Sequence, residues 1–132
     1  MNHLFGGAYR GRRVLVTGHT GFKGSWLCAW LDRLGARVSG LALAPDTRPS
    51  HWELLGLSNV ASHEVDLLDA AAVARVVAGC EPEIIFHLAA QPLVRRAYRD
   101  PSDTFSSNVM GLVNLFEAVR ADDRLLALVN VT

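Results

Sequence analysis

A chain of 132 residues that is 50% hydrophobic and 20% charged can bury a single core, which excludes a disordered protein. Thirteen basic and thirteen acidic side chains balance, which excludes a surface specialised for nucleic acids or anionic membranes. The two cysteines lack metal-ligand and redox-pair spacing, and neither a signal peptide nor a bilayer-spanning apolar run is found. We therefore expect a soluble, cytoplasmic domain without a metal site.

A predicted strand at residues 12–16 leads into a glycine-rich turn. The glycines that follow it, Gly18, Gly21 and Gly24, have the spacing G-x-x-G-x-x-G. Apolar residues at helical spacing over 26–34 come next, so the order is strand, tight turn and helix. This context favours a dinucleotide-binding turn over an ordinary glycine turn.

Each glycine of the turn has a separate physical role. Gly18 can adopt backbone angles that are closed to other residues, Gly21 lets the main chain approach a pyrophosphate, and Gly24 lets the helix pack closely on the strand. The unpaired N–H groups and the positive dipole end at the helix N-terminus then favour the anion. The sequence therefore predicts a pyrophosphate site at this turn.

The rest of the chain alternates between strands and helices. The predicted elements are a strand at 36–43, a short helix at 51–57 capped by Ser50, a strand at 59–65, a helix from an Asp69 cap to Gly79, a strand at 84–87, a loop at 88–99, a helix from Pro101 or Ser102 to Arg120, and a strand at 125–131. This alternation predicts an α/β fold, with a Rossmann-like doubly wound parallel sheet of five strands in the order 3-2-1-4-5 and flanking helices.

Two acidic residues are candidates for the adenosine end of a dinucleotide. Asp46 lies about twenty positions beyond the glycine turn, where an acidic residue binds ribose hydroxyls, but the neighbouring Arg48 suits a 2′-phosphate. Both NAD and NADP therefore stay possible cofactors. The alternative is that Asp46 and Arg48 are solvated loop charges that bind no cofactor. Asp66 follows a predicted strand on the adenine side and can accept from the exocyclic amine, whereas Asp is also common in turns.

Other polar and aromatic residues fit structural roles. We expect Lys23 to face solvent near any pyrophosphate, His19 to be a turn residue, and His87 to be a hydrogen-bonded histidine of a buried strand. Trp26 and Trp30, four residues apart on one helix face, are predicted to belong to the core.

Three arginines lie in the predicted loop after the fourth strand, at the ligand end of the sheet. They are Arg95, Arg96 and Arg99. Either they meet a substrate phosphate or they are solvated loop charges.

Four segments of the chain form an ordered set of motifs. They are residues 17–24 (TGHTGFKG), 66–67 (DL), 87–94 (HLAAQPLV) and 108–111 (NVMG). In this order they resemble the extended short-chain dehydrogenase/reductases, and the resemblance covers nearly the whole chain. The His19 and Phe22-Lys23 form of the turn, together with 45–55 and 91–96, is most similar to the CDP-glucose 4,6-dehydratases of that family.

The resemblance implies an enzyme with tightly held NAD that oxidises a nucleotide-linked sugar at C4, eliminates water across C5 and C6, and returns the hydride to C6. Gln91, Arg95 and Arg96 are candidates for contact with the nucleotide-sugar substrate, and the helix at 101–120 resembles one that builds the family's homodimer. The candidate cofactor-binding residues are Gly18, Thr20, Gly21, Phe22, Lys23, Gly24, Asp46, Asp66, Leu67, Leu88, Ala89, Ala90, Gln91 and Asn108.

The groups that move protons in this family are expected outside the chain. The Tyr-x-x-x-Lys pair and the acid–base pair that expels water lie beyond Thr132 in the family, and Thr132 is adjacent to the expected catalytic hydroxyl. We therefore expect residues 1–132 to be the NAD(P)-binding Rossmann domain of a longer enzyme and to be inactive alone. The alternatives are an epimerase or reductase of another nucleotide sugar, or a stand-alone dinucleotide-binding module.

Overall fold

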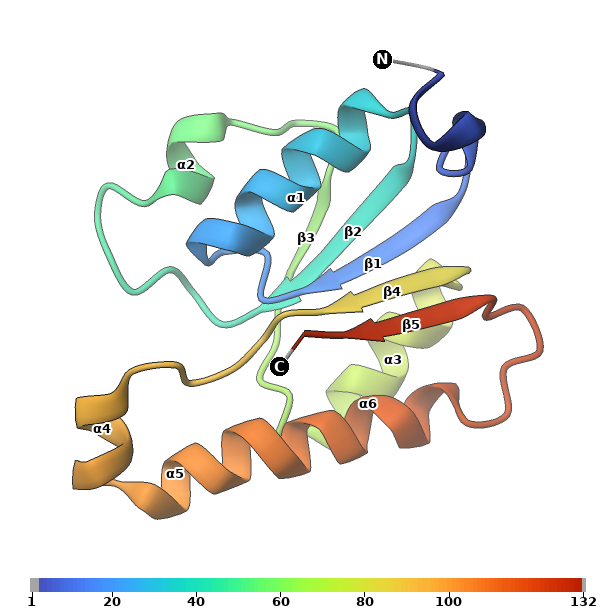
Figure 1. The fold of residues 1–132 in the computed structure, drawn as a ribbon. Helices are drawn as coiled ribbons and strands as arrows, with labels where there is room; N and C mark the ends of the chain where they lie inside the picture. Colours follow the sequence, from blue (N-terminus) through green and yellow to red (C-terminus); the bar gives the residue numbers. More distant parts are fainter. Residues whose placement is uncertain (1–2, 132) are drawn as a thin grey trace.

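The computed structural model describes residues 3–131, which form a five-stranded parallel sheet with helices on both faces (Figure 1). The strands stand in the order β3-β2-β1-β4-β5, which confirms the predicted Rossmann-like α/β fold. All pairings are parallel, so the carboxyl ends of the strands share one edge. The strands are β1 Arg13–Thr17, β2 Arg37–Ala42, β3 Ala61–Glu64, β4 Ile84–His87 and β5 Ala127–Asn130.

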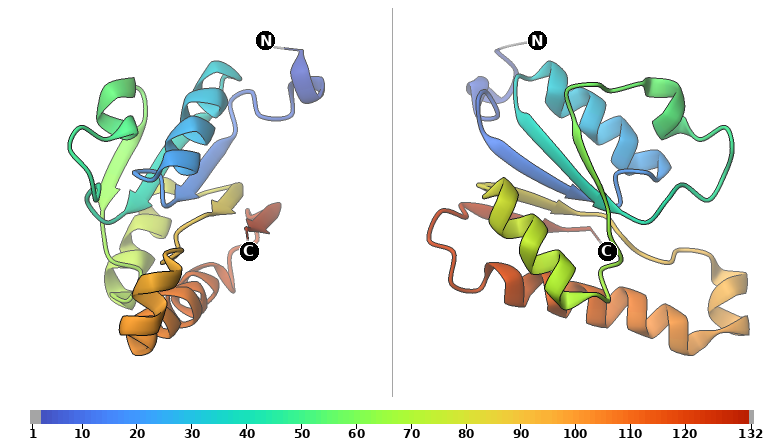
Figure 2. Two further views of the ribbon diagram at one scale, coloured as in Figure 1. Left: turned by 60° about the vertical axis from the view of Figure 1, so that its left-hand side comes forward. Right: turned by 180° about the vertical axis from the view of Figure 1, so that it is seen from behind.

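Helices connect the strands and cover both faces of the sheet. They are the short 3-10 helix η1 Leu4–Gly7, α1 Phe22–Arg33, α2 His51–Leu55, α3 Ala70–Cys80, α4 Val94–Arg99, α5 Pro101–Phe105, the π-helical turn η2 Ser106–Met110 and α6 Gly111–Val119. Figures 1 and 2 show α1 and α2 on one face and α3 and α6 on the other. Within residues 3–131, no helix is long and apolar enough to cross a membrane.

Alternate residues of the central strands fill two apolar layers. Leu15 and Ile85 are fully buried in the layer that includes side chains of α3 and α6. Val14 and Val38 are buried in the layer that includes side chains of α1. Because both faces of the sheet are covered here, its central strands have continuous apolar sequences rather than alternating ones.

Side-chain caps fix two helix starts as predicted. At the start of α2, the Ser50 hydroxyl accepts from the Glu53 N–H, and the Glu53 carboxylate accepts from the Ser50 N–H. At the start of α3, Asp69 Oδ1 accepts from the Ala72 N–H at 3.0 Å. In both cases a polar side chain replaces a backbone partner that the first turn of a helix lacks.

The end of α3 differs from the prediction at Gly79. The helix continues to Cys80, and Glu81 adopts the left-handed conformation, with a φ of 46°, that usually favours glycine. The Glu81 carbonyl oxygen accepts from Arg13 Nε at 2.7 Å, and its carboxylate pairs with Arg124 at 2.7 Å. These contacts with distant parts of the chain hold the strained residue, so the local sequence could not predict this end.

The prediction of a loop over 88–99 is wrong in its second half, where α4 runs from Val94 to Arg99. No side chain of the described residues caps α4, and the helix packs against α5. Asp100 separates the two helices and caps α5 by accepting from the Asp103 N–H at 2.9 Å. A six-residue helix is too short to be stable alone, so α4 depends on this packing rather than on its own sequence pattern.

The helix predicted from Pro101 starts there and continues through η2 into α6. Leu115 is fully buried in the core layer that α3 and α6 share. Val109, Val113 and Phe116 are instead 50%, 40% and 45% exposed. This helix therefore presents an uncovered apolar stripe.

The prediction that Trp26 and Trp30 belong to the core is wrong. They lie on the outer face of α1, where Trp26 contacts His51 with ring centroids 4.7 Å apart and Trp30 contacts Phe5 at 5.6 Å. The buried face of α1 carries other residues, Cys28 and Leu31 among them, and helical spacing puts both indoles on the opposite face.

Candidate functional site

The glycine turn lies where the strand order reverses. The chain runs from β1 to β2 and β3 on one side and from β4 to β5 on the other, so the reversal falls between β1 and β4. In open parallel sheets, ligands bind at this point, outside the carboxyl ends of the strands. Residues 17–24 and 88–94 leave the sheet along this edge (Figure 1).

Gly18 and Gly24 occupy positions that admit no side chain. Gly18 has a φ of +77°, and a Cβ there would lie 2.8 Å from the backbone nitrogen of Ala89. A Cβ at Gly24 would collide with the Gly18 carbonyl oxygen and lie 2.9 Å from the Cα of His19. The close packing predicted for Gly24 is thus with the turn itself rather than with the strand.

Gly21 leaves open space at the start of α1. A Cβ at this N-cap residue would meet only the Gly18 carbonyl oxygen, at 3.3 Å, and no side chain among residues 3–131 caps the helix. The first hydrogen bond of α1 runs from the Ser25 N–H to the Gly21 carbonyl at 2.9 Å, so the N–H groups of residues 22–24 have no partner within the helix. Free N–H groups, open space and a positive helix end fit a pyrophosphate.

Thr17 joins the ends of β1 and β4. Its hydroxyl oxygen accepts from the N–H groups of Leu88 and Ala89, both at 3.2 Å, and lies 2.7 Å from His87 Nδ1. Because this oxygen already accepts two hydrogen bonds, the hydroxyl donates its own proton to Nδ1. Nδ1 is then the unprotonated ring nitrogen, and Nε2 carries the ring proton. Burial lowers the pKa of His87 and so favours this neutral form. His87 is the hydrogen-bonded structural histidine that we expect.

His19 belongs to the turn but is fully buried. Its ring lies against Gly40 of β2 and makes an edge contact with Trp52, with ring centroids 4.6 Å apart. His19 Nε2 is 2.7 Å from Ser62 Oγ in β3. Burial lowers the pKa of His19 to about 4, so the neutral ring ties the turn to two strands at physiological pH.

The remaining turn residues lie nearer the surface. Thr20 Oγ1 donates to the Leu43 carbonyl at 2.8 Å, which fixes the turn to the end of β2. The Phe22 ring is exposed and lies 5.2 Å from the His51 ring. Lys23 is exposed in the first turn of α1, as predicted. None of these side chains fills the space at Gly21.

The acidic candidates and Leu67 lie on the β2–β3 side of the turn. Asp46 is exposed in the connection between β2 and α2. Asp66 is also exposed, and its Oδ1 accepts from the Leu68 N–H at 2.9 Å, which is a turn role. Leu67 is buried, and its carbonyl accepts from Asn114 Nδ2 at 2.8 Å. A contact of Asp66 with adenine stays a prediction.

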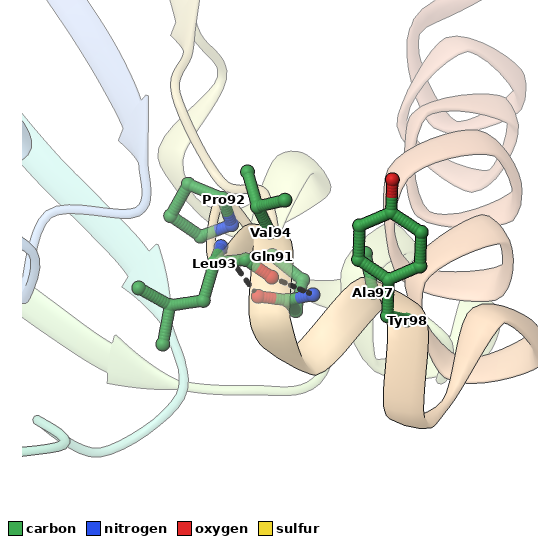
Figure 3. Close-up of a pocket in the computed structure, with 6 residues that line it drawn as sticks. All are labelled: Gln91, Pro92, Leu93, Val94, Ala97 and Tyr98. Atoms are coloured by element: carbon green, nitrogen blue, oxygen red, sulfur yellow. Dashed lines mark hydrogen bonds between the residues drawn. The ribbon is translucent and has the colours of Figure 1, made fainter.

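The segment after β4 is folded around Gln91, which follows the exposed Ala90. The Asn108 carboxamide bonds the Gln91 main chain, accepting from its N–H at 2.8 Å and donating to its carbonyl at 3.4 Å. The Gln91 side chain accepts from the Leu93 N–H at 2.7 Å and donates to the Leu93 carbonyl at 3.3 Å (Figure 3). It also donates to Thr104 Oγ1 at 2.9 Å.

An open hollow of about 330 Å³ lies beside this segment (Figure 3). The candidate substrate residues Arg95 and Arg96 are exposed and do not line the hollow. Arg96 pairs with Asp103 at 3.0 Å, and helical spacing turns the arginines away from the lining face of α4. Their contact with a substrate therefore stays a prediction. The lining residues are Gln91, Pro92, Leu93, Val94, Ala97 and Tyr98.

Two hydroxyl residues that shape this edge, Thr17 and Thr104, were not singled out in the sequence analysis. The sequence could have indicated Thr17, because its hydroxyl comes at the carboxyl end of a central strand, where ligands bind in such sheets. Thr104 has no such signal, because its partner Gln91 is 13 residues away. Thr132 lies outside the described residues. Within residues 3–131, no group of three or more His, Cys, Asp or Glu side chains is placed to hold a metal ion.

Known proteins resemble this chain over most of its length. Residues 15–128 match the sequence model of the family described as GDP-mannose 4,6 dehydratase. The chain is 49% identical to a CDP-glucose 4,6-dehydratase of Salmonella typhimurium, over 94% of this chain and 35% of the relative. It is 38% identical to UDP-glucuronate 4-epimerase 3 of Arabidopsis thaliana, over 85% of this chain and 27% of the relative. The chain thus spans about a third of the length of these curated relatives.

Solved structures share the fold. An epimerase of Methanothermobacter thermautotrophicus matches with a TM-score of 0.80 and 28% identity, over 94% of this chain and 36% of that one. A UDP-glucose 4-epimerase of Thermus thermophilus, in complex with NAD, matches with a TM-score of 0.72 and 35% identity, over 82% of this chain and 33% of that one. By its motifs, sheet order and family match, the chain belongs to the extended short-chain dehydrogenase/reductases, in the family described as GDP-mannose 4,6 dehydratase.

Proposed function

We propose that residues 1–132 are the NAD-binding part of a longer nucleotide-sugar 4,6-dehydratase that converts CDP-glucose to CDP-4-keto-6-deoxyglucose. The observation that carries the proposal is the backbone cradle at the start of α1, in a chain 49% identical to a CDP-glucose 4,6-dehydratase. The reaction oxidises the sugar at C4, eliminates water across C5 and C6, and returns the hydride to C6. The longer enzyme is proposed because the chain spans 35% of that relative.

The residues present fit NAD along the carboxyl edge of the sheet. The N–H groups of residues 22–24 bind the pyrophosphate, Asp46 binds the adenine ribose, and Asp66-Leu67 meets the adenine. Residues 88–90 lie along the second ribose. A bound nicotinamide supplies reversible hydride transfer. A carboxylate at Asp46 suits the free hydroxyls of NAD, whereas Arg48 keeps NADP as the alternative.

We assign the segment after β4 to the substrate side of the site. Gln91 and Asn108 hold the shape of this segment, and Arg95 and Arg96 add positive charge near the substrate diphosphate. No Tyr-x-x-x-Lys sequence occurs in the 132 residues, so the longer enzyme must supply the proton-moving groups. The catalytic hydroxyl is proposed to follow Thr132.

We further propose that the enzyme is a homodimer through the helix at 101–120. Phe105, Val109, Val113 and Phe116 leave an apolar stripe exposed on this helix, and such stripes mark interaction surfaces. The purified chain should therefore self-associate in sedimentation velocity, and Phe116→Asp should weaken the association. A monomeric profile at high concentration would count against this dimer.

The catalytic proposal is tested by comparing this chain with the longer protein. Each is incubated with NAD and CDP-glucose, and products are followed by NMR. We expect the 4-keto-6-deoxy product from the longer protein only, because positioned acid–base groups contribute roughly a hundred- to ten-thousand-fold. Equal turnover by the short chain would overturn our placement of these groups. Formation of a 4-epimer without loss of water would overturn the dehydratase in favour of an epimerase.

A further inference from the structure

Thr104 connects α5 to the segment that follows β4. Its hydroxyl accepts from Gln91 Nε2 at 2.9 Å and donates to the Asp100 carbonyl at 3.2 Å. Thr104 and Gln91 are both half-buried, so water competes only partly for these bonds. The hydroxyl is thus a fixed link between a helix and a segment that has no strand or helix pairing of its own.

Both N–H protons of the Gln91 side chain are used within the chain. Nε2 donates one proton to Thr104 and the other to the Leu93 carbonyl, while Oε1 accepts from the Leu93 N–H. A carboxamide has only two N–H protons, so Gln91 has none left to donate to a ligand. It therefore acts by shaping residues 91–93.

Residues 91–93 form one wall of the hollow beside α4 (Figure 3). Leu93 is 61% exposed, and Val94 next to it is 67% exposed, so neither is held in place by burial. Two contacts fix Leu93 in this wall: its carbonyl accepts from the Ala97 N–H at 3.0 Å as α4 begins, and its N–H donates to the Gln91 side chain. Thr104, which ties Gln91 to α5, therefore supports the Gln91 contribution to this wall, beside the bonds from Ala97 and Asn108.

We propose that Thr104 is a positioning residue that pre-organises this wall for the nucleotide-sugar substrate; the inference rests on the proposed function of the same site. Without the hydroxyl, Gln91 loses a partner and the segment occupies its binding conformation for a smaller fraction of the time. Apparent affinity falls by that fraction, whereas molecules that have bound react as before. The effect should therefore appear in KM rather than in kcat.

The longer enzyme tests this in steady-state kinetics with CDP-glucose. Thr104→Val, which keeps the shape but removes the hydroxyl, should raise KM roughly tenfold with kcat within about twofold, since tenfold corresponds to one hydrogen bond. Thr104→Ser should restore KM, and Ser102→Ala, an exposed hydroxyl on the same helix, should leave it unchanged. An unchanged KM in Thr104→Val, or a loss confined to kcat, would overturn the proposal.

A second variant keeps the test valid if Thr104→Val folds poorly. Gln91→Met removes every hydrogen bond of the carboxamide at similar volume and should raise KM at least as much. Because both residues act through one link, adding Thr104→Val to Gln91→Met should change KM no further. Additive effects of the two substitutions would overturn the link.

Hydrogen exchange on the 132-residue chain gives a readout without turnover. The Leu93 N–H, which bonds Gln91 Oε1, should lose protection roughly tenfold in Thr104→Val and keep it in Thr104→Ser. Unchanged protection in Thr104→Val would overturn the link. Absence of turnover by the wild-type longer enzyme would instead refute the proposed function, and the exchange result would still decide whether Thr104 positions the wall.

Discussion

Replacement of Gly24 by alanine tests how closely α1 packs on the glycine turn. The added Cβ would overlap the Gly18 carbonyl oxygen and would lie 2.7 Å from the Gly18 carbonyl carbon and 2.9 Å from the Cα of His19. All three atoms belong to the main chain, so no side chain can rotate away. The start of α1 must therefore move as a unit.

This movement should lower the unfolding free energy substantially, although only one methyl group is added. Overpacking of a tight interior costs about 1–3 kcal/mol, and we expect about 3 kcal/mol because the backbone has to shift. Against a total unfolding free energy of about 5–15 kcal/mol, this is a large loss, and it should lower Tm by about 10 °C. The N–H groups of residues 22–24 move with the helix, so NAD affinity should fall as well.

The assay is thermal and urea unfolding followed by circular dichroism, with Gly79→Ala as the matched control. A Cβ at Gly79 would meet nothing within 4 Å, and the residue lies inside α3. Alanine there should stabilise by about 0.5–1 kcal/mol, because glycine is the poorer helix former. The same change from glycine to alanine should thus lower the unfolding free energy at Gly24 and raise it at Gly79. Gly24→Ala within about 0.5 kcal/mol of wild type would refute the packing argument.

Three further outcomes are expected. Thr17→Val should destabilise the fold by about 2–4 kcal/mol because it leaves the Ala89 N–H and the His87 imidazole nitrogen without their partner, while Thr17→Ser should not; equal unfolding curves would contradict this. Gly21→Val should weaken NAD binding at least about tenfold in calorimetry by filling the pyrophosphate space, and unchanged affinity would remove the site from this turn. Because burial lowers the pKa of His19 from 6.5 to about 4, its stabilising neutral form is fully present above pH 6.5 and is lost as pH falls toward 4. Urea titrations at several pH values should show that the unfolding free energy falls less steeply with decreasing pH in His19→Asn than in wild type. Equal slopes of unfolding free energy against pH would exclude His19 as a cause of the acid destabilisation.

Local sequence signals predicted the parts of the fold that local physics determines. The glycine turn and the start of α5 at Pro101 appear where the residue type alone restricts the backbone. Ser50 and Asp69 cap their helices because a short polar side chain can reach the free N–H groups of the first turn. The strand order followed from the handedness of β-α-β units, which holds for any such alternation.

The errors fall where a distant contact decides the outcome. α4 forms against α5, and Glu81 is held left-handed by Arg13 and Arg124, which lie 68 and 43 positions away in the chain. The same limit applies to the candidate site. Motifs identified the residues of the turn, but the link from Thr104 to Gln91 depends on how a helix docks and has no sequence pattern.

The proposed NAD site combines two kinds of recognition, which should respond differently to mutation. The proposed recognising groups of the glycine turn are main-chain atoms, and a side chain at Gly18 or Gly24 would collide with the main chain, so a change at either should alter folding and NAD binding together. Asp46 is an exposed side chain, and its replacement should alter binding while stability stays within about 0.5 kcal/mol. In a series of variants, NAD affinity and stability should fall together at the glycines, whereas NAD affinity alone should fall at Asp46. That result would indicate that the backbone holds the pyrophosphate and that the Asp46 side chain holds the ribose. Discrimination between NAD and NADP would then depend on the exposed charged residues between β2 and α2, Asp46 and Arg48.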